Sequence, residues 1–394
     1  MRVTFLFFFL LGIGSNFVLQ AQENEKIRVK GIVLNQDTRE PVVFANIGLV
    51  GINVGTAADM KGYFELTVLT KYASHVVRFS AIGYASHEVD FSELRGRGEV
   101  EILLKPVAYS IQNVSVTGQG MQFRSLFDRV VERMGKNYIS RPYNYEGYFE
   151  YGVSVNGGEK KTKEAIVTIY DSRGYQREDI ERNFTALNYT FNHIRRSHEA
   201  TTALDGMVYF DDILTSDIVR HTRNVLDTRN YRRYTFRNKG VFKQEGDSIQ
   251  IIGYEAINPS ISITGDASVL KYSGEIYVQL KDAVVIKNVM TIVSSHFVPM
   301  GRNLKAIDAP AQREVTTTIT TNYEKRNSYH FLSGVSMLYS YHEGANRIQG
   351  EVQYQTTRVN INEVVPVAGR IYLESMDPDY SFWDRYTINQ ASED

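Results

Sequence analysis

Residues 27–105 form a series of short strand-like runs separated by turn-forming residues, and this pattern constrains the fold more than any other feature of the sequence. The runs follow one another at intervals of roughly ten residues, which is the spacing of a small all-β sandwich. In the run YFELTV, the side chains of Phe64, Leu66 and Val68 share one face, as they do in a strand with one buried side. We therefore predict six or seven short strands that pack as a sandwich.

The stretch GTAADMKGYFEL, residues 55–66, places Asp59 three positions before Gly62 and just ahead of an alternating run. An EF-hand calcium loop needs oxygen ligands at alternate positions, but alanine, methionine and lysine occupy the positions around Asp59. The stretch fits a turn instead, because an aspartate side chain accepts hydrogen bonds from the backbone two residues on and glycine readily adopts positive φ. We predict that Asp59 and Gly62 form a structural turn and bind no metal.

Several short motifs occur in a fixed order across this region: Gly31, Pro41, Ala45-Asn46, Gly55-Thr56, Asp59, Gly62-Tyr63-Phe64 and Gly83-Tyr84. In this order they resemble the carboxypeptidase-regulatory-like domain of Gram-negative envelope proteins. The resemblance implies a prealbumin-like sandwich of seven strands, a module that also precedes the plug and barrel of TonB-dependent outer-membrane receptors. The rest of this chain is too short for the large barrel of such a receptor, so the resemblance implies an accessory role beside TonB-dependent uptake.

Residues 1–21 are predicted to form a secretory signal peptide. Arg2 supplies a positive charge, residues 5–13 form an apolar core too short to span a bilayer, and Ala21 is a small residue before a cleavage point. The chain contains no cysteine, which excludes disulfides and a lipidated cysteine. We expect an exported protein of the periplasm or outer-membrane surface. Because no later apolar run approaches the length of a membrane span, we expect no transmembrane segment in the mature chain.

Residues 106–120 are predicted to form a linker, and residues 121–394 a second domain of the α+β class. An amphipathic helix opens this domain, because apolar residues recur at spacings of three and four over residues 123–134, with Gly135 as its stop. Most of the following runs have the pattern of strands, and a helical segment at residues 208–219 interrupts them. We expect a large, curved antiparallel sheet with helices packed against it.

Three tracts of this second region carry a further resemblance: YNYEGYFEY, GEIYVQLKDAVVIKNV and DPDYSFWDRYTI. They resemble the uncharacterised β-rich region that often follows the regulatory-like domain in envelope proteins. Its shape is similar to the half-open barrels of lipoprotein-carrier proteins. This likeness implies a hydrophobic ligand inside the sheet, although a fold alone does not establish a function.

The sequence lacks the motifs of common catalytic sites. Zinc carboxypeptidases need histidines and a carboxylate close in sequence, as in His-x-x-Glu or His-Glu-x-x-His, and neither pattern occurs. There is also no cysteine nucleophile, Gly-x-Ser-x-Gly elbow, P-loop or dinucleotide fingerprint. Ser268 and Lys271 form a Ser-x-x-Lys pattern without the helical context that its mechanism requires, and His193 and His198 are interpreted as surface residues. We predict a protein that is not an enzyme and needs no metal or other cofactor.

Dispersed carboxylates are the remaining route to catalysis, because glycosidases use two acidic residues that only the fold brings together. Asp377, Asp379 and Asp384 lie near Trp383, which is the only tryptophan of the chain. The cluster fits either a hydrolase site or a C-terminal segment that Trp383 and Tyr386 fasten to the sheet. The second interpretation is favoured.

Basic residues are concentrated between Arg220 and Lys243, where Asp227 is the only acidic residue. The eight basic residues are Arg220, Arg223, Arg229, Arg232, Arg233, Arg237, Lys239 and Lys243. If the tract RRYTFR is a strand, Tyr234 and Phe236 point to one side while the arginines at 233 and 237 point to the other.

This basic stretch has two interpretations. Clustered arginines bind phosphate groups well, so the stretch is a candidate contact for anionic lipid headgroups, lipopolysaccharide or an acidic partner. The candidate residues are Arg229, Arg232, Arg233 and Arg237. The favoured alternative is a solvated strand face whose charges pair with acidic residues from elsewhere in the chain.

The overall charge limits the classes of partner. A net charge of -1 and a pI of about 6.7 argue against nucleic acid, because neutralising phosphates requires a basic surface. Our leading hypothesis is a non-catalytic exported protein that acts as a binding or accessory module for an unknown envelope protein or ligand, with peripheral membrane contact. A lipid or lipoprotein carrier and a hydrolase with dispersed carboxylates are the alternatives.

Overall fold

The structure is a computed structural model and falls into two compact units. Unit 1 comprises Met1–Val107 with Tyr386–Asp394, and unit 2 comprises Ala108–Arg385. The structure describes residues 26–52, 54–108, 123–177, 186–196, 210–295, 314–326, 328–371, 377–383 and 386. The predicted signal peptide and most of the predicted linker lie outside these residues. No helix within the described ranges is long and apolar enough to cross a bilayer.

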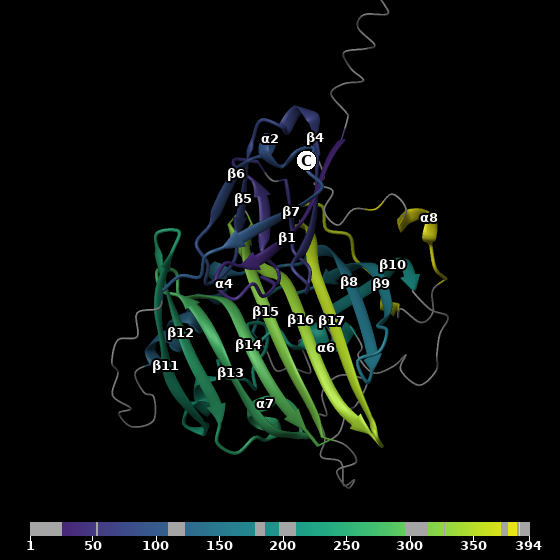
Figure 1. The fold of residues 1–394 in the computed structure, drawn as a ribbon. Coiled ribbons are helices and arrows are strands. Elements are labelled where there is room, and N and C mark those ends of the chain that lie inside the picture. Colours follow the sequence, from purple (N-terminus) through teal and green to yellow (C-terminus); the bar gives the residue numbers. More distant parts are fainter. Residues whose placement is uncertain are drawn as a thin grey trace, which may run out of the picture. The chain divides into compact units, whose positions relative to one another are not determined.

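Unit 1 is built from short strands in two sheets (Figure 1). The strands are β1 (Lys26–Asn35), β2 (Asn46–Leu49), β3 (Gly55–Ala57), β4 (Tyr63–Leu69), β5 (Val76–Ser80), β6 (His87–Asp90) and β7 (Glu99–Leu104). Their orders are β4-β1-β7 in one sheet and β3-β2-β5-β6 in the other. Two short helices, η1 (Thr70–Tyr72) and α2 (Phe91–Leu94), complete the unit. This arrangement fits the predicted β-sandwich.

The core of unit 1 follows the alternation of its strands. Phe64, Leu66 and Val68 of β4 are buried, as their spacing predicts. Gly31 of β1 allows the neighbouring strands β4 and β7 to approach closely. A Cβ atom at this position would lie 2.3 Å from the carbonyl oxygen of Val100 and 2.8 Å from the ring of Phe64. A glycine at this position is therefore required by packing.

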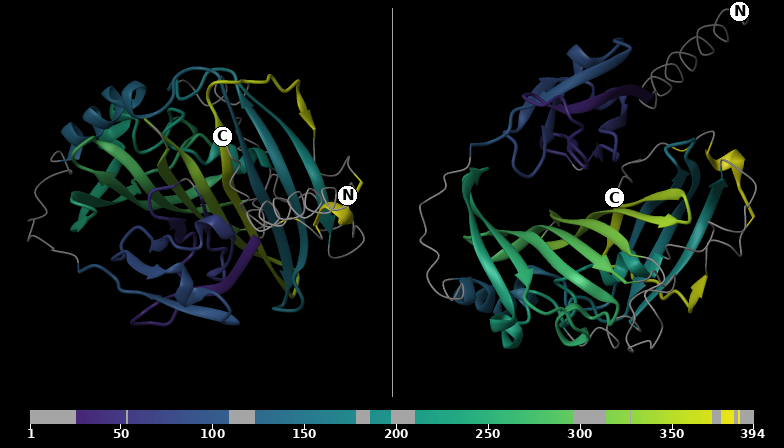
Figure 2. Two further views of the ribbon diagram at one scale, coloured as in Figure 1. Left: turned by 90° about the horizontal axis from the view of Figure 1, so that it is seen from above. Right: turned by 60° about the horizontal axis from the view of Figure 1, so that its bottom comes forward.

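Unit 2 contains a long sheet that curves strongly (Figure 2). Its strands, in spatial order, are β11 (Tyr234–Gln244), β12 (Asp247–Ala256), β13 (Val269–Gln279), β14 (Val284–Ser294), β15 (Val315–Arg326), β16 (Tyr329–Glu343), β17 (Asn346–Asn360), β8 (Tyr143–Val155), β9 (Lys161–Asp171), β10 (Leu187–Arg196) and β18 (Arg370–Ile371). All neighbours are antiparallel except β10 and β18. The large antiparallel sheet that the sequence predicts is confirmed.

The helices of unit 2 differ from their predicted bounds. They are α3 (Arg124–Glu132), α4 (Met134–Asn137), α6 (Phe210–Thr215), η3 (Thr228–Arg233), α7 (Ile261–Thr264) and α8 (Tyr380–Trp383). The prediction that Gly135 stops the first helix is wrong, because the break falls at Arg133, where ψ is 0°, and Gly135 lies inside α4. Helix α6 ends at Thr215, before the end of the helical segment predicted over residues 208–219. The Asp217 carboxylate accepts a hydrogen bond from the backbone N–H of Val219, which competes with helical hydrogen bonding.

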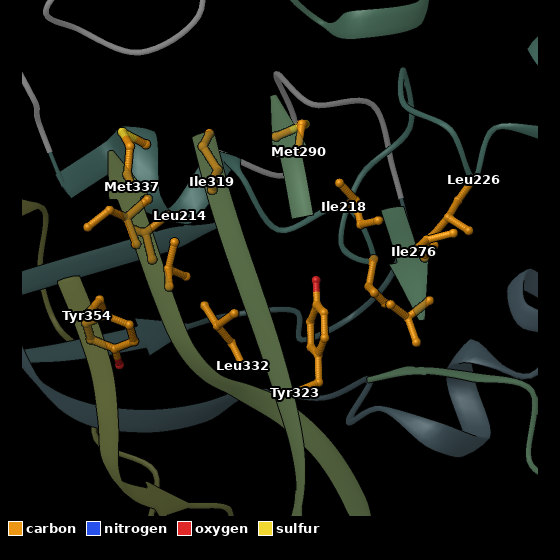
Figure 3. Close-up of a cluster of buried hydrophobic side chains, with 14 of the residues drawn as sticks. Leu214, Ile218, Leu226, Ile276, Met290, Ile319, Tyr323, Leu332, Met337 and Tyr354 are labelled. Carbon is orange, nitrogen blue, oxygen red and sulfur yellow. The ribbon is translucent and has the colours of Figure 1, made fainter. Parts of the chain in front are cut away.

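Residues 210–233, which we call the inner segment, fill the interior of the curved sheet. Leu214, Ile218 and Leu226 of this segment are buried against side chains of the sheet, among them Met290 and Ile319 (Figure 3). We call the sheet face that carries this core the inner face and the opposite face the outer face. The packed interior determines which surfaces of unit 2 remain open for binding.

Candidate functional site

A groove of about 350 Å³ lies across β11, β12, β13 and β14. Most of its walls are outer-face side chains, and polar and charged residues predominate. The residues that line it are Thr235, Arg237, Lys239, Gly253, Tyr254, Glu255, Ser273, Gly274, Glu275, Val289 and Thr291. The groove is therefore a polar, open site and not an apolar cavity.

Two ion pairs cross the groove. Arg237 Nη2 lies 3.8 Å from Glu255 Oε2, and Lys239 Nζ lies 3.2 Å from Glu275 Oε1. The second pair spans from β11 to β13 over Gly253, where an added Cβ atom would lie 3.1 Å from Lys239 Cε. Exposed ion pairs of this kind contribute only about 0 to 1 kcal/mol, so these charges can exchange partners with a ligand at little cost.

The four arginines predicted as an anionic contact lie in two elements. Arg229, Arg232 and Arg233 belong to η3, and only Arg237 lies in a strand, on the outer face of β11. The prediction that RRYTFR is a strand is therefore wrong for its first two residues, because the strand begins at Tyr234. From that residue on, the predicted alternation is observed, with the rings of Tyr234 and Phe236 buried and Arg237 exposed.

Most of the described basic side chains have partners. The Arg229 guanidinium donates hydrogen bonds of 2.8 and 2.9 Å to Asp227, and Arg233 donates to Ser262 Oγ at 2.9 Å and to Ser260 Oγ at 3.2 Å. Burial alone would raise the pKa of Asp227, but the hydrogen bond and charge of Arg229 lower it below its ordinary value. The basic stretch is thus divided among separate local structures.

Arg220 of the same stretch lies in the core of unit 2. It donates hydrogen bonds to the Asp171 carboxylate at the end of β9 and to the Tyr143 hydroxyl on β8, the latter at 3.0 Å. The Tyr323 hydroxyl of β15 donates a hydrogen bond of 2.6 Å to Asp217 of the inner segment. Burial raises the pKa of Asp217, and the positive charge of Arg220 opposes this rise. These buried polar contacts fasten the inner segment to three strands.

A pair of carboxylates that the sequence did not identify lies on β8 and β9. Glu150 and Glu164 are direct cross-strand partners. The Tyr148 hydroxyl lies 3.0 Å from Glu150 Oε2 and 2.7 Å from Glu164 Oε1, so these oxygens are at most about 6 Å apart, near the separation of about 5 to 5.5 Å between the carboxyl groups of retaining glycosidases. Burial and then the two carboxylates raise the pKa of Tyr148 well above its ordinary value, which keeps the hydroxyl protonated.

Basic groups on either side hold this carboxylate pair. Lys160 Nζ lies 3.1 Å from Glu150, and the Arg195 guanidinium contacts Glu164 at 2.7 and 2.6 Å. Burial alone would lower the pKa of Lys160, but the charge of Glu150 and a hydrogen bond to Glu351 raise it above its ordinary value. Both carboxylates are therefore tied into ion pairs on the outer face.

The C-terminal segment 377–383 packs on β10. Trp383 is 7% exposed, its ring meets that of Tyr148 edge-on at 6.2 Å, and the Arg195 guanidinium lies 4.8 Å from its ring centroid. The backbone N–H of Asp379 donates to Ile194 O at 2.8 Å. Trp383 thus fastens this segment to the sheet.

The two described carboxylates of the acidic cluster, Asp377 and Asp379, have different surroundings. Asp377 is exposed, and Asp384 lies outside the described residues. The Asp379 carboxylate lies 2.8 Å from His193 Nδ1, and the His193 ring stacks on Phe382 with centroids 3.7 Å apart. Tyr386 is grouped with unit 1.

The remaining predicted positions are Ser268, Lys271 and His198. The buried Ser268 hydroxyl donates to Asp266 at 2.7 Å, whereas Lys271 is exposed. His198 lies outside the described residues. Among the residues that the structure does describe, no group of three or more His, Cys, Asp or Glu side chains is arranged to hold a metal ion.

Asp59 and Gly62 lie in a tight turn of unit 1. Asp59 Oδ1 accepts hydrogen bonds of 2.8 Å from the backbone N–H groups of Lys61 and Tyr63. The φ angle of Gly62 is 80°, a value that favours glycine. The carboxylate thus caps the turn that leads into β4.

Comparisons with known proteins identify the N-terminal module. Residues 29–116 match the family model of the CarboxypepD_reg-like domain, which confirms the resemblance in this part of the chain. A search of curated proteins found no match.

Solved structures that resemble the chain cover about three fifths of it. A LolA superfamily protein from Nitrosomonas europaea is 8% identical, with 62% of this chain and 94% of that chain covered and a TM-score of 0.25. A DUF1329 family protein from Desulfovibrio piger is 7% identical, with 62% and 94% covered and a TM-score of 0.28. An outer membrane lipoprotein-sorting protein domain from Vibrio parahaemolyticus is 8% identical, with 61% and 93% covered and a TM-score of 0.26.

Proposed function

We propose that this chain is a non-catalytic, exported accessory protein of the bacterial envelope, in which unit 2 binds a polar partner through the groove across β11 to β14. The signal-peptide pattern of residues 1–21 and the match of residues 29–116 to the CarboxypepD_reg-like domain support the location. Attachment to a TonB-dependent uptake system is a narrower form of the same proposal.

The groove is the single observation that carries the binding proposal. It offers two cations and two carboxylates on one open face, and its ion pairs are weak enough to open for a ligand. A partner that presents both charges can replace each internal pair by a contact of its own. An extended polypeptide with alternating charges has this chemistry.

Affinity capture from solubilised envelopes tests the proposal. The parent protein should recover an envelope component, and a variant with Arg237→Glu and Lys239→Glu should not. A matched control with Lys281→Glu and Lys325→Glu changes exposed lysines outside the groove and should recover the component as the parent does. Equal recovery by all three proteins, or no recovery by the parent, would count against the groove.

A hydrolase is a second candidate because the fold brings Glu150 and Glu164 together. Retaining glycosidases use two carboxylates at a similar separation. The ion pairs of both residues argue for a structural role, so we expect no glycosidase activity. Activity on glycoside substrates that is lost in both Glu150→Gln and Glu164→Gln would favour the hydrolase instead.

A lipid carrier requires space for a hydrophobic ligand inside the sheet. In the described residues, side chains of the inner segment occupy that interior, and buried contacts from Arg220 and Asp217 hold the segment in place. A carrier function would require the segment to move away from the sheet. The groove needs no such rearrangement, so binding on the outer face is the proposal that this structure supports best.

A further inference from the structure

Two polar side chains in the apolar interior of unit 2 have hydrogen-bonding atoms that no described residue satisfies. Asn288 on β14 and Thr321 on β15 are both 0% exposed. Asn288 Nδ2 and Thr321 Oγ1 have no hydrogen-bond partner among the described residues. The two residues are direct cross-strand partners, so their Cβ atoms lie about 4.5 to 5.5 Å apart on the inner face.

A third residue orients the asparagine. The Tyr254 hydroxyl on β12 donates a hydrogen bond of 3.0 Å to Asn288 Oδ1. It reaches across β13 at Gly274, where an added Cβ atom would lie 2.5 Å from the same hydroxyl. A glycine on the intervening strand is therefore needed for this contact. The contact holds the Asn288 amide with its N–H groups free to donate elsewhere.

The two outer cross-strand neighbours of this pair are apolar and cannot satisfy the unpaired Asn288 Nδ2 and Thr321 Oγ1 atoms. Ile276 lies beside Asn288 on β13, Val335 lies beside Thr321 on β16, and both are fully buried. Nearly all buried polar groups in folded proteins have a partner, and an unpaired one is costly. Two such atoms on facing residues therefore indicate a common partner that fits between them.

We propose that Asn288 and Thr321 form an internal binding site for one small polar group that carries an oxygen atom. The oxygen accepts a hydrogen bond from Asn288 Nδ2 and shares a second hydrogen bond with Thr321 Oγ1. A water molecule has this chemistry. A hydroxyl or carbonyl group of a bound hydrophobic molecule has it too, but such a molecule requires the inner segment to move and make room. Tyr254 is a positioning residue, because it acts through the Asn288 amide.

The sign of a stability change tests the site. Valine has the shape of threonine but lacks the hydroxyl, so Thr321→Val removes the hydrogen bond to the bound group and leaves that group underpaired. We expect the melting temperature to fall by roughly 2 to 4 °C. Thr320→Val, the matched control on the partly exposed outer face, should change it little. A rise in melting temperature for Thr321→Val would show an unsatisfied hydroxyl and would overturn the proposal.

A high-resolution crystal structure of the purified protein identifies the bound group. We expect electron density for one atom within hydrogen-bond distance, about 2.7 to 3.2 Å, of both Asn288 Nδ2 and Thr321 Oγ1. An isolated peak identifies water, whereas continuous density with a matching mass adduct in native mass spectrometry identifies an organic ligand. A direct Asn288–Thr321 hydrogen bond with no atom between them would contradict the site.

Discussion

Arg220 and Asp171 form an ion pair that is almost completely removed from solvent, with side chains 4% and 0% exposed. Arg220 belongs to the inner segment and Asp171 is the last residue of β9, so the pair joins the segment to the sheet. Burial alone would lower the pKa of Arg220, but the charge of Asp171 raises it above its ordinary value. The guanidinium is therefore ionised in the core.

Asp171→Ala should destabilise unit 2 by about 3 to 5 kcal/mol, because it leaves the Arg220 charge buried without its partner. Urea unfolding followed by the fluorescence of Trp383, the only tryptophan, reports on unit 2. Asp128→Ala, which breaks an exposed pair with Arg124, is the control and should cost less than about 1 kcal/mol. Similar losses in the two variants would argue against an anchoring role for the buried pair.

Asp59→Ala should lower the stability of unit 1 by about 1 kcal/mol, because two backbone N–H groups lose their acceptor in the turn. The turn is exposed, so water replaces part of the lost bonding. A thermal melt with and without calcium checks the result, and calcium should protect neither the parent nor the variant. Calcium-dependent protection of the parent that disappears in the variant would show a metal site.

His330 should make unit 2 less stable in mildly acidic solution. Burial lowers its pKa in the folded protein, whereas the unfolded chain binds the proton near pH 6.5. In the pH range between the lowered pKa of His330 and about 6.5, the unfolded state therefore binds more protons than the folded state. The free energy of unfolding falls as pH decreases through this range. Above about pH 6.5, the contribution of neutral His330 to the stability of unit 2 is fully present.

Unfolding free energies measured between about pH 7.5 and 5.5 test this prediction. His330→Gln should lose less stability on acidification than the parent protein, because glutamine does not titrate. His342→Gln, at an exposed position of β16, should follow the parent. The prediction fails if the slope for His330→Gln matches that of the parent.

Anionic lipid vesicles should not sediment the protein better than neutral vesicles do. The four candidate arginines are split between η3 and β11, and Arg229, Arg233 and Arg237 contact acidic or hydroxyl side chains. A variant with Arg232, Arg233 and Arg237 changed to serine should therefore behave as the parent. Sedimentation of the parent with anionic vesicles alone, abolished in this variant, would establish a membrane contact.

Local sequence patterns predicted the local structure well. The alternation in YFELTV places Phe64 and Leu66 in the core of unit 1, and the spacing of apolar residues after Phe123 predicts α3. These features depend on neighbours in sequence, so a single chain reveals them. The same holds for the alternation of Tyr234 and Phe236 once the strand has begun.

Contacts between distant residues could not be predicted in this way. Arg220 lies in a basic stretch that suggested a surface, yet its partner Asp171 lies on β9, 49 residues earlier in the sequence. Glu150 and Glu164 become neighbours only through the register of β8 and β9, which alternation does not specify. The same limit applies to Asn288 and Thr321, whose polar pairing depends on the register of β14 and β15.

Site-specific photo-crosslinking from the groove is the most direct test of the binding proposal. A photoreactive phenylalanine analogue at Ser273, which lines the groove, should capture an envelope component in living cells. The same analogue at Lys281, an exposed turn position outside the groove, should not. A specific adduct from Ser273 alone would support binding through the groove. Adducts of equal yield from both positions, or none from Ser273, would contradict it.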